Sequence, residues 1–275
     1  MVHALSTTFG IIVSANFFYT NVIYQILLTF LAWIMLHISN KIGHGCRGLI
    51  SAIFCVSFNM ICQCFIPLDW NKIFGVQMIL AMKLISVAFD MDTDVSNQSS
   101  KPEKPKEHAE EPEEQLDSPE EILILHVPTF WKYFGYALCP GITAFGPWVS
   151  YKDYLAIYIH PRWNFTWLLK IMSSMMFGFL FQTISLEISP FIQWFIPENQ
   201  PIWISAYIVA MSERASHYFI YFISEASAVA CGFVDVSVAE PLKIEVPRSL
   251  KEVVISWNRP MHQWFKKCMY LILHF

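Results

Sequence analysis

A charged stretch near residue 250 reads Pro247-Arg248-Ser249-Leu250-Lys251-Glu252-Val253-Val254-Ile255-Ser256-Trp257-Asn258-Arg259-Pro260-Met261, in a chain that is otherwise very apolar. Two prolines bracket a run whose apolar residues recur at helical spacing, namely Leu250, Val253, Val254 and Trp257. Its polar groups come from Arg248, Lys251, Glu252 and Arg259. This pattern predicts a short helix that lies at a membrane face.

The composition of the whole chain points to a membrane protein. Of its 275 residues, 55% are hydrophobic and only 15% are charged, which is too apolar for an ordinary soluble domain. We therefore predict an all-α protein, a multi-pass transmembrane helical bundle. The net charge of −4 has a local origin, because nine of the 22 acidic residues fall within residues 101–121.

Several apolar runs predict the membrane spans. One of them, Val127–Val149, contains three prolines and three glycines and is therefore expected to be kinked or broken. Before the first span, Phe9–Tyr19 is interpreted as an interfacial helix. The predicted spans are Val22–Ile38, Leu49–Phe65, Gly75–Phe89, Val127–Val149, Phe165–Leu186 and Trp203–Phe233.

Ionisable residues interrupt two of these spans. Lys83 is expected to extend towards an interface, since a lysine at bilayer depth is costly. The span Trp203–Phe233 contains Glu213, Arg214, His217 and Glu225. Such residues mark either an interior cavity or an ion-paired core, and the sequence leaves both alternatives open.

The seven cysteines predict neither a disulfide framework nor a metal site. Their number is odd, they are scattered, and most lie in apolar runs, where a cysteine acts as a small hydrophobic residue. Cys46 and Cys268 lie beside basic residues and are candidates for palmitoylation.

Four blocks of sequence form a specific combination. They are Phe145-Gly146-Pro147-Trp148-Val149-Ser150, Ser216-His217-Tyr218-Phe219, Phe222-Ile223-Ser224-Glu225-Ala226, and a run from Pro241 that includes Ser256-Trp257-Asn258-x-Pro260-Met261. Together they closely resemble the protein-serine O-acyltransferase branch of the membrane-bound O-acyltransferase family. The likeness runs from about Tyr24 to the C-terminus.

The resemblance implies a single membrane domain of that family, partial in extent, over residues 1–275. Within it, residues 93–121 are expected to form a disordered acidic loop on the cytosolic side, because they are rich in Ser, Pro, Lys and Glu and lack aromatic residues. Residues 234–263 are expected to form the active-site segment at the membrane face. The chain looks truncated at both ends.

The activity that the resemblance implies is protein lipidation. An enzyme of this branch is a multi-pass protein of the endoplasmic reticulum membrane. It moves a cis-monounsaturated acyl group, palmitoleoyl, from acyl-CoA to a serine of Wnt proteins, which supports Wnt secretion and signalling. The expected partners are acyl-CoA, Wnt proteins and membrane lipids. No nucleic acid, bound cofactor or metal is expected.

The resemblance also implies site residues. Asn258 matches the family's active-site asparagine, which is expected to orient the substrate or stabilise an oxyanion. The family's active-site histidine, further along the chain, has no counterpart. A second hypothesis is therefore a catalytically incomplete fragment or isoform that binds acyl-CoA or Wnt without turnover. Substrate contacts are expected from Trp257, His217, Arg248 and Arg259.

Each of these assignments has a structural alternative. Asn258 could be a helix cap, Trp257 an interfacial anchor, and His217 a partner of Glu213 in the bundle core. Arg248 could pair with Glu252 one turn away. A basic cytosolic mouth for coenzyme A is expected from Lys243, Arg248, Lys251, Arg259, Lys266 and Lys267.

Overall fold

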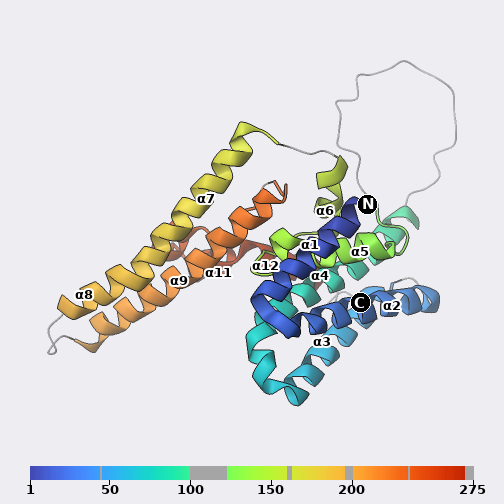
Figure 1. Ribbon diagram of the computed structural model, residues 1–275, viewed down its shortest axis with the longest axis horizontal. Helices are drawn as coiled ribbons and strands as arrows, with labels where there is room; N and C mark the ends of the chain where they lie inside the picture. Colours follow the sequence, from blue (N-terminus) through green and yellow to red (C-terminus); the bar gives the residue numbers. More distant parts are fainter. Residues whose placement is uncertain (44, 100–122, 160–162, 196–200, 235, 270–275) are drawn as a thin grey trace.

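The chain forms a helical membrane bundle. The computed structural model describes residues 1–43, 45–99, 123–159, 163–195, 201–234 and 236–269, and within these residues it contains no β-strand (Figure 1). The all-α prediction is confirmed. The α-helices are α1 (Val2–Phe18), α2 (Val22–Ile42), α3 (Arg47–Phe65), α4 (Pro67–Ser99), α5 (Phe130–Ala137), α6 (Tyr151–Ile159), α7 (Phe165–Thr183), α8 (Ser189–Phe195), α9 (Ile202–Ala230), α10 (Pro241–Glu245), α11 (Leu250–Trp257) and α12 (Arg259–Trp264).

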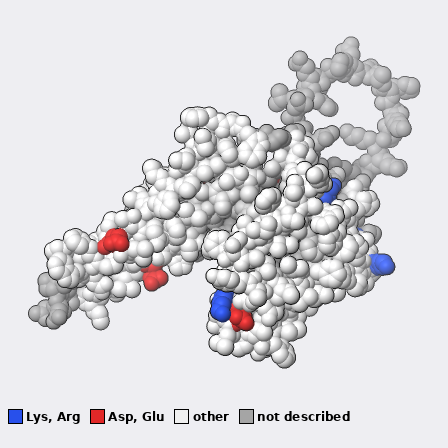
Figure 2. Space-filling model, viewed as in Figure 1, with Lys and Arg blue, Asp and Glu red and all other residues white. Residues whose placement is uncertain are grey.

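Four stretches of helix are long and apolar enough to cross a membrane. They are Val2–Ile42, Arg47–Phe65, Pro67–Ser96 and Phe165–Phe195. The predicted interfacial helix Phe9–Tyr19 forms the second part of α1, except that Tyr19 follows its end. The chain turns between α1 and α2 at Tyr19, whose φ of 51° lies in the left-handed region. One face of the molecule shows few charged residues, as a surface in contact with lipid requires (Figure 2).

Helix α1 crosses the turn after α5 at a glycine. A methyl group at Gly10 would overlap the carbonyl oxygen of Leu138, and a backbone atom cannot move aside cheaply. Ser6 adds a hydrogen bond from its hydroxyl to the Gly135 carbonyl, 3.0 Å long. Because Gly10 has no side chain, α1 can pack directly against the backbone at the end of α5.

Replacing Gly10 with alanine is expected to lower the free energy of unfolding by about 2–3 kcal/mol, the cost of overpacking against backbone. Gly75 is the matched control, because it also lies inside a helix but a methyl group there meets nothing within 4 Å. Gly75→Ala is expected to leave stability unchanged or raise it by about 0.5–1 kcal/mol. Thermal unfolding in detergent compares the two; equal effects would contradict the proposed crossing.

Helix α4 packs against α2, α3, α5 and α6, which together with α1 form the main body of the molecule. The second half of α4 is buried. Lys83 is 1% exposed, and its ammonium donates to the Ala137 carbonyl at 3.2 Å and lies 5.8 Å from the Tyr136 ring centroid. The prediction that Lys83 extends to an interface is wrong. The reason is tertiary: the short helix α5 covers α4 at this depth and offers a carbonyl oxygen.

The region Val127–Val149 is broken, as predicted. Helix α5 ends at Ala137, a single 3₁₀ turn follows at Pro140–Ile142, and the chain then has no regular structure up to α6. Protein groups satisfy the freed backbone: the Tyr136 hydroxyl donates to the Val149 carbonyl at 2.6 Å. Irregular backbone at this depth is therefore enclosed by protein, as a bilayer demands.

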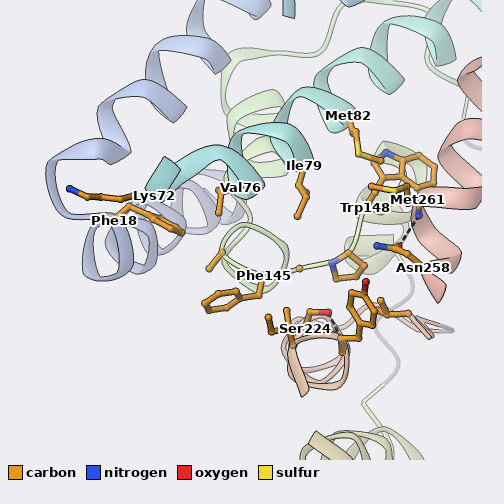
Figure 3. A pocket seen from close by; sticks show the side chains of 17 residues that line it. Phe18, Lys72, Val76, Ile79, Met82, Phe145, Trp148, Ser224, Asn258 and Met261 are labelled. Atoms are coloured by element: carbon orange, nitrogen blue, oxygen red, sulfur yellow. Dashed lines mark hydrogen bonds between the residues drawn. The ribbon is translucent and has the colours of Figure 1, made fainter. Parts of the chain in front are cut away.

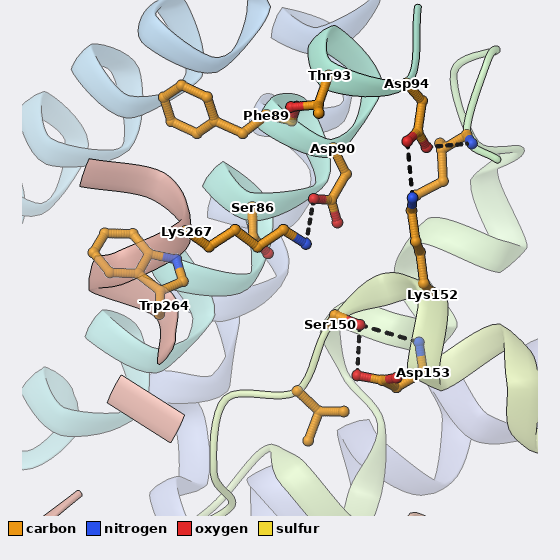
Figure 4. Close-up of polar contacts among 12 residues, drawn as sticks. Ser86, Phe89, Asp90, Thr93, Asp94, Ser150, Lys152, Asp153, Trp264 and Lys267 are labelled. Atoms are coloured by element: carbon orange, nitrogen blue, oxygen red, sulfur yellow. Dashed lines mark hydrogen bonds and ion pairs between the residues drawn. The ribbon is translucent and has the colours of Figure 1, made fainter. Parts of the chain in front are cut away.

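The predicted loop at 93–121 begins later than expected. Helix α4 continues to Ser99, so residues 93–99 are helical, and the rest of that loop lies outside the described residues. Two buried carboxylates explain the extension. Asp92 accepts the backbone N–H groups of Gly45 and Gly48, and Asp94 accepts that of Ile124 at 2.7 Å and pairs with Lys152 at 2.8 Å (Figure 4).

Helices α7, α8 and α9 form an elongated hairpin that projects from the body (Figure 1). The predicted span Trp203–Phe233 is helical up to Ala230, the end of α9, which packs along α7. Helix α9 is not among the four stretches that are long and apolar enough to cross a membrane. Of its ionisable residues, Glu225 is buried and paired with Lys170 of α7, whereas Glu213 and His217 are exposed. At Glu225 the ion-paired alternative holds.

Candidate active site

A cavity of about 320 Å³ lies where α4, the loop before α6, α9 and the start of α12 meet (Figure 3). That volume is at the small end of the range of ligand sites in proteins. Its wall is mostly apolar, with a small number of polar groups. The lining residues are Phe18, Lys72, Gly75, Val76, Ile79, Met82, Ala144, Phe145, Gly146, Pro147, Trp148, Ile220, Tyr221, Ser224, Val238, Asn258 and Met261.

Asn258 lies on the cavity wall, in the break between α11 and α12. Its backbone is extended, with φ −148° and ψ 87°, as is typical of an N-cap residue, and it separates the end of α11 from the start of α12. The side-chain oxygen accepts the N–H of Met261 at 3.1 Å, which caps α12. The amide nitrogen makes no hydrogen bond within the described part of the chain. The side-chain oxygen of Asn258 thus fixes the turn, and its amide nitrogen remains available to a ligand.

The Asn258 turn is fixed to the preceding segment by two backbone hydrogen bonds. The N–H of Arg259 donates to the Val238 carbonyl at 2.9 Å, and the N–H of Glu240 donates to the Ser256 carbonyl at 3.1 Å. These bonds lie on either side of Asn258. The position of Asn258 is therefore set by these main-chain bonds together with the side-chain bond that caps α12.

The helix after Asn258 is fixed to α4. The indole N–H of Trp264 donates to the Met82 carbonyl at 3.0 Å, and Lys267 pairs with the buried Asp90 at 2.5 Å (Figure 4). Met82 also lines the cavity. These contacts therefore hold α4 and the Asn258 turn in place as two walls of the cavity.

Two of the predicted contacts, Trp257 and His217, lie beside the cavity rather than on its wall. The Trp257 ring is 5.8 Å from that of His217 and 6.0 Å from those of Tyr218 and Tyr221, measured between centroids. The His217 ring hydrogen-bonds to the Glu213 carbonyl at 2.8 Å. Trp257 therefore supports Tyr221, which does line the cavity.

The two predicted arginines are not on the cavity wall either. Arg248 is exposed, and its backbone N–H, rather than its side chain, donates to Glu252 at 2.9 Å. With Ser249, whose hydroxyl accepts the Glu252 N–H at 3.3 Å, this forms a capping arrangement that starts α11. The Arg259 guanidinium pairs with Glu240 at 2.7 Å.

The expected basic mouth is partly neutralised. Glu240 takes up both Lys243 and Arg259, and a hydrogen bond from Lys243 is the main cause that lowers the pKa of its carboxyl. Lys267 is occupied by Asp90. Of the six bases expected to form this mouth, Arg248, Lys251 and Lys266 are exposed and have no carboxylate partner within the described residues.

Sequence reasoning missed the residues that hold the site together. Val238 and Glu225 connect α9 to the Asn258 turn, and Val76 and Ile79 of α4 form the opposite wall. The block containing Ser224 and Glu225 was a usable signal, since a carboxylate within an apolar run needs a partner. No sequence pattern placed Val238.

The described residues give no sign of a metal centre, because no three His, Cys, Asp or Glu side chains among them lie close enough to hold an ion. The chemistry available at the cavity is an amide donor, hydroxyl groups, the ammonium of Lys72 and an apolar wall. Such a wall suits a hydrocarbon chain, and the amide suits a carbonyl or oxyanion.

Comparison with known proteins identifies the relatives. No family model matches the chain. The human protein-serine O-palmitoleoyltransferase porcupine is 27% identical over 296 residues, which cover 98% of this chain and 58% of the human protein. The mouse protein of the same name gives the same figures. That of Anopheles gambiae is 32% identical over 238 residues, covering 74% of this chain and 41% of the mosquito protein.

The chain thus spans less than two thirds of the length of these relatives. The match covers the Asn258 turn, α4 and α9 in the human and mouse comparisons, since these include nearly all of the chain. The chain is therefore similar to porcupine protein-serine O-palmitoleoyltransferases, along almost its whole length in the human and mouse comparisons and over 74% of it in the mosquito comparison.

Proposed function

We propose that this protein transfers a cis-monounsaturated acyl group, palmitoleoyl, from acyl-CoA to a serine of Wnt proteins in the endoplasmic reticulum membrane. In this role it supports Wnt secretion and signalling. The observation that carries the proposal is Asn258, whose amide nitrogen is unoccupied at the wall of a mostly apolar cavity. The names of the relatives support the reaction class.

The reaction places two demands on the site. The serine oxygen forms a bond to the thioester carbonyl carbon, and the carbonyl oxygen becomes an oxyanion before the bond to the coenzyme A sulfur breaks. A fixed N–H donor aimed at that oxygen typically stabilises the transition state by about 3 kcal/mol. Asn258 supplies such a donor, held by the main chain on both sides.

The apolar wall meets the second demand, which is to hold the acyl chain. Val76, Ile79 and Met82 present one helical face of α4, and Phe145 closes the cavity from the loop (Figure 3). Removing each methylene group of an acyl chain from water contributes about 0.8 kcal/mol. Binding at this wall would place the thioester end near the polar turn.

One observation favours a second function, binding without turnover. The serine proton must pass to a base, for which neutral histidine is the usual choice. None of the 17 residues on the cavity wall is a histidine. On this alternative the chain binds acyl-CoA or Wnt and does not catalyse transfer.

Acyl transfer by the purified chain separates the two functions. The chain in lipid nanodiscs is given palmitoleoyl-CoA that carries a photoreactive group in its acyl chain, with a Wnt peptide as acceptor. Cross-linking at the cavity together with acylated peptide supports the transferase. Cross-linking without acylated peptide supports binding alone, and an absence of cross-linking to α4 or the Asn258 turn contradicts both.

A further inference from the structure

Glu225 is a buried carboxylate that joins three parts of the molecule. It is 2% exposed and lies on α9, next to Ser224 of the cavity wall. One oxygen, Oε1, accepts the hydroxyl of Ser174 at 3.0 Å and pairs with Lys170 at 2.5 Å, both from α7. The other, Oε2, accepts the N–H of Val238 at 3.2 Å.

Val238 transmits this contact to the Asn258 turn. It is 2% exposed and lines the cavity. Its N–H is held by Glu225, and its carbonyl accepts the N–H of Arg259, the residue directly after Asn258, at 2.9 Å. Two hydrogen bonds across a single residue therefore connect α9 to the asparagine.

We propose that Glu225 is a positioning residue for acyl transfer: it fixes Val238, and through Val238 it holds the Asn258 amide towards the cavity. This inference rests on the function proposed above. Glu225 does not line the cavity, so its role is to position rather than to react. A misplacement of about 1 Å in a catalytic group can cost about 10²-fold in rate.

The two oxygens of Glu225 have separable roles. Lys170 is 45% exposed in its side chain and can turn to solvent, so it balances charge without fixing the turn. Val238 is buried, and its N–H has no other acceptor in the described contacts. The length and acceptor capacity of residue 225 should therefore matter more than its charge.

This division defines a set of variants. Glu225→Gln keeps an acceptor at the same reach and removes the charge. Glu225→Asp keeps the charge and withdraws the acceptor by one methylene group. Lys170→Met removes only the ion pair. Glu213→Ala is the matched control, because Glu213 is an exposed carboxylate on the same helix.

Hydrogen–deuterium exchange and steady-state kinetics of the chain in nanodiscs test the proposal together. In Glu225→Asp, exchange in peptides covering residues 236–262 is expected to accelerate about tenfold or more, with peptides of α3 unchanged. The kcat is expected to fall about 10²-fold, with KM for palmitoleoyl-CoA within about twofold. Glu225→Gln, Lys170→Met and Glu213→Ala are expected to stay near wild type in both measurements.

Three results would overturn the inference, and the first two are unchanged exchange at 236–262 in Glu225→Asp and accelerated exchange with unchanged kcat. A loss equal in Glu225→Gln and Glu225→Asp would show that charge, not position, matters and would also overturn it. If the wild-type chain transfers no acyl group, the proposed function fails, and exchange alone then decides whether Glu225 holds the Asn258 turn.

Discussion

Replacing Asn258 with serine is expected to lower kcat for acyl transfer about 10²–10³-fold without unfolding the protein. The size is that of losing one preorganised donor to an oxyanion. Serine is chosen because its hydroxyl can still accept the Met261 N–H and so cap α12, whereas it cannot reach into the cavity as the amide does. Transfer of palmitoleoyl to a Wnt peptide is the measurement.

Asn258→Ala gives the companion result. It removes both the donor and the cap, so it is expected to lose transfer to the same degree and also about 1 kcal/mol of stability. The matched control is Asn164→Ala at the start of α7, where the asparagine oxygen accepts the Trp167 N–H at 2.9 Å and is absent from the cavity wall. It should lose the cap energy alone. If Asn258→Ser transferred palmitoleoyl at the wild-type rate, Asn258 would have no part in the reaction.

Replacing Asp92 with alanine is expected to lower the free energy of unfolding by about 3–5 kcal/mol, as removing one partner of a buried ion pair does. Asp92 accepts the N–H groups of Gly45 at 3.1 Å and Gly48 at 2.9 Å, and lies 3.7 Å from Arg47 Nε. The side chains of Asp92 and Arg47 are only 5% and 1% exposed. The variant removes the carboxylate from a buried guanidinium and from the start of α3.

Asp69→Ala is the control for the buried pair. Asp69 is on the same helix and pairs with Lys72 at 3.2 Å, but their side chains are 45% and 68% exposed. An exposed pair of this kind is worth about 0–1 kcal/mol. Thermal unfolding of both variants in one detergent makes the comparison, and similar losses would show that burial of Asp92 has no special effect.

Much of the fold could be predicted from the sequence because it depends on local composition. The length of the apolar runs predicts the helices, and the prolines and glycines of Val127–Val149 predict the break. The end of α4 could not be predicted in this way. Residues 93–99 read as loop, yet contacts of Asp92 and Asp94 with distant residues keep the helix intact.

The candidate site shows the same division. The sequence block that resembles the family singles out Asn258, and in the structure Asn258 lies on the cavity wall. Trp257 belongs to the same block, and Arg259 stands at its variable position. In the structure Trp257 packs against the rings of α9, and Arg259 pairs with Glu240. Sequence gives the residues of such a turn, whereas the main-chain bonds of Val238 decide which of them faces the cavity.

The close crossing at Gly10 bears on how the protein enters the membrane. Helix α5 has 8 residues, far short of the roughly 20 that cross a bilayer unaided. Helix α5 packs against α1 and α4, which precede it in the chain and are therefore synthesised first. We therefore expect insertion to be sequential: helices α1 to α4 partition into lipid first, and α5 then enters the bilayer by packing against α1 and α4.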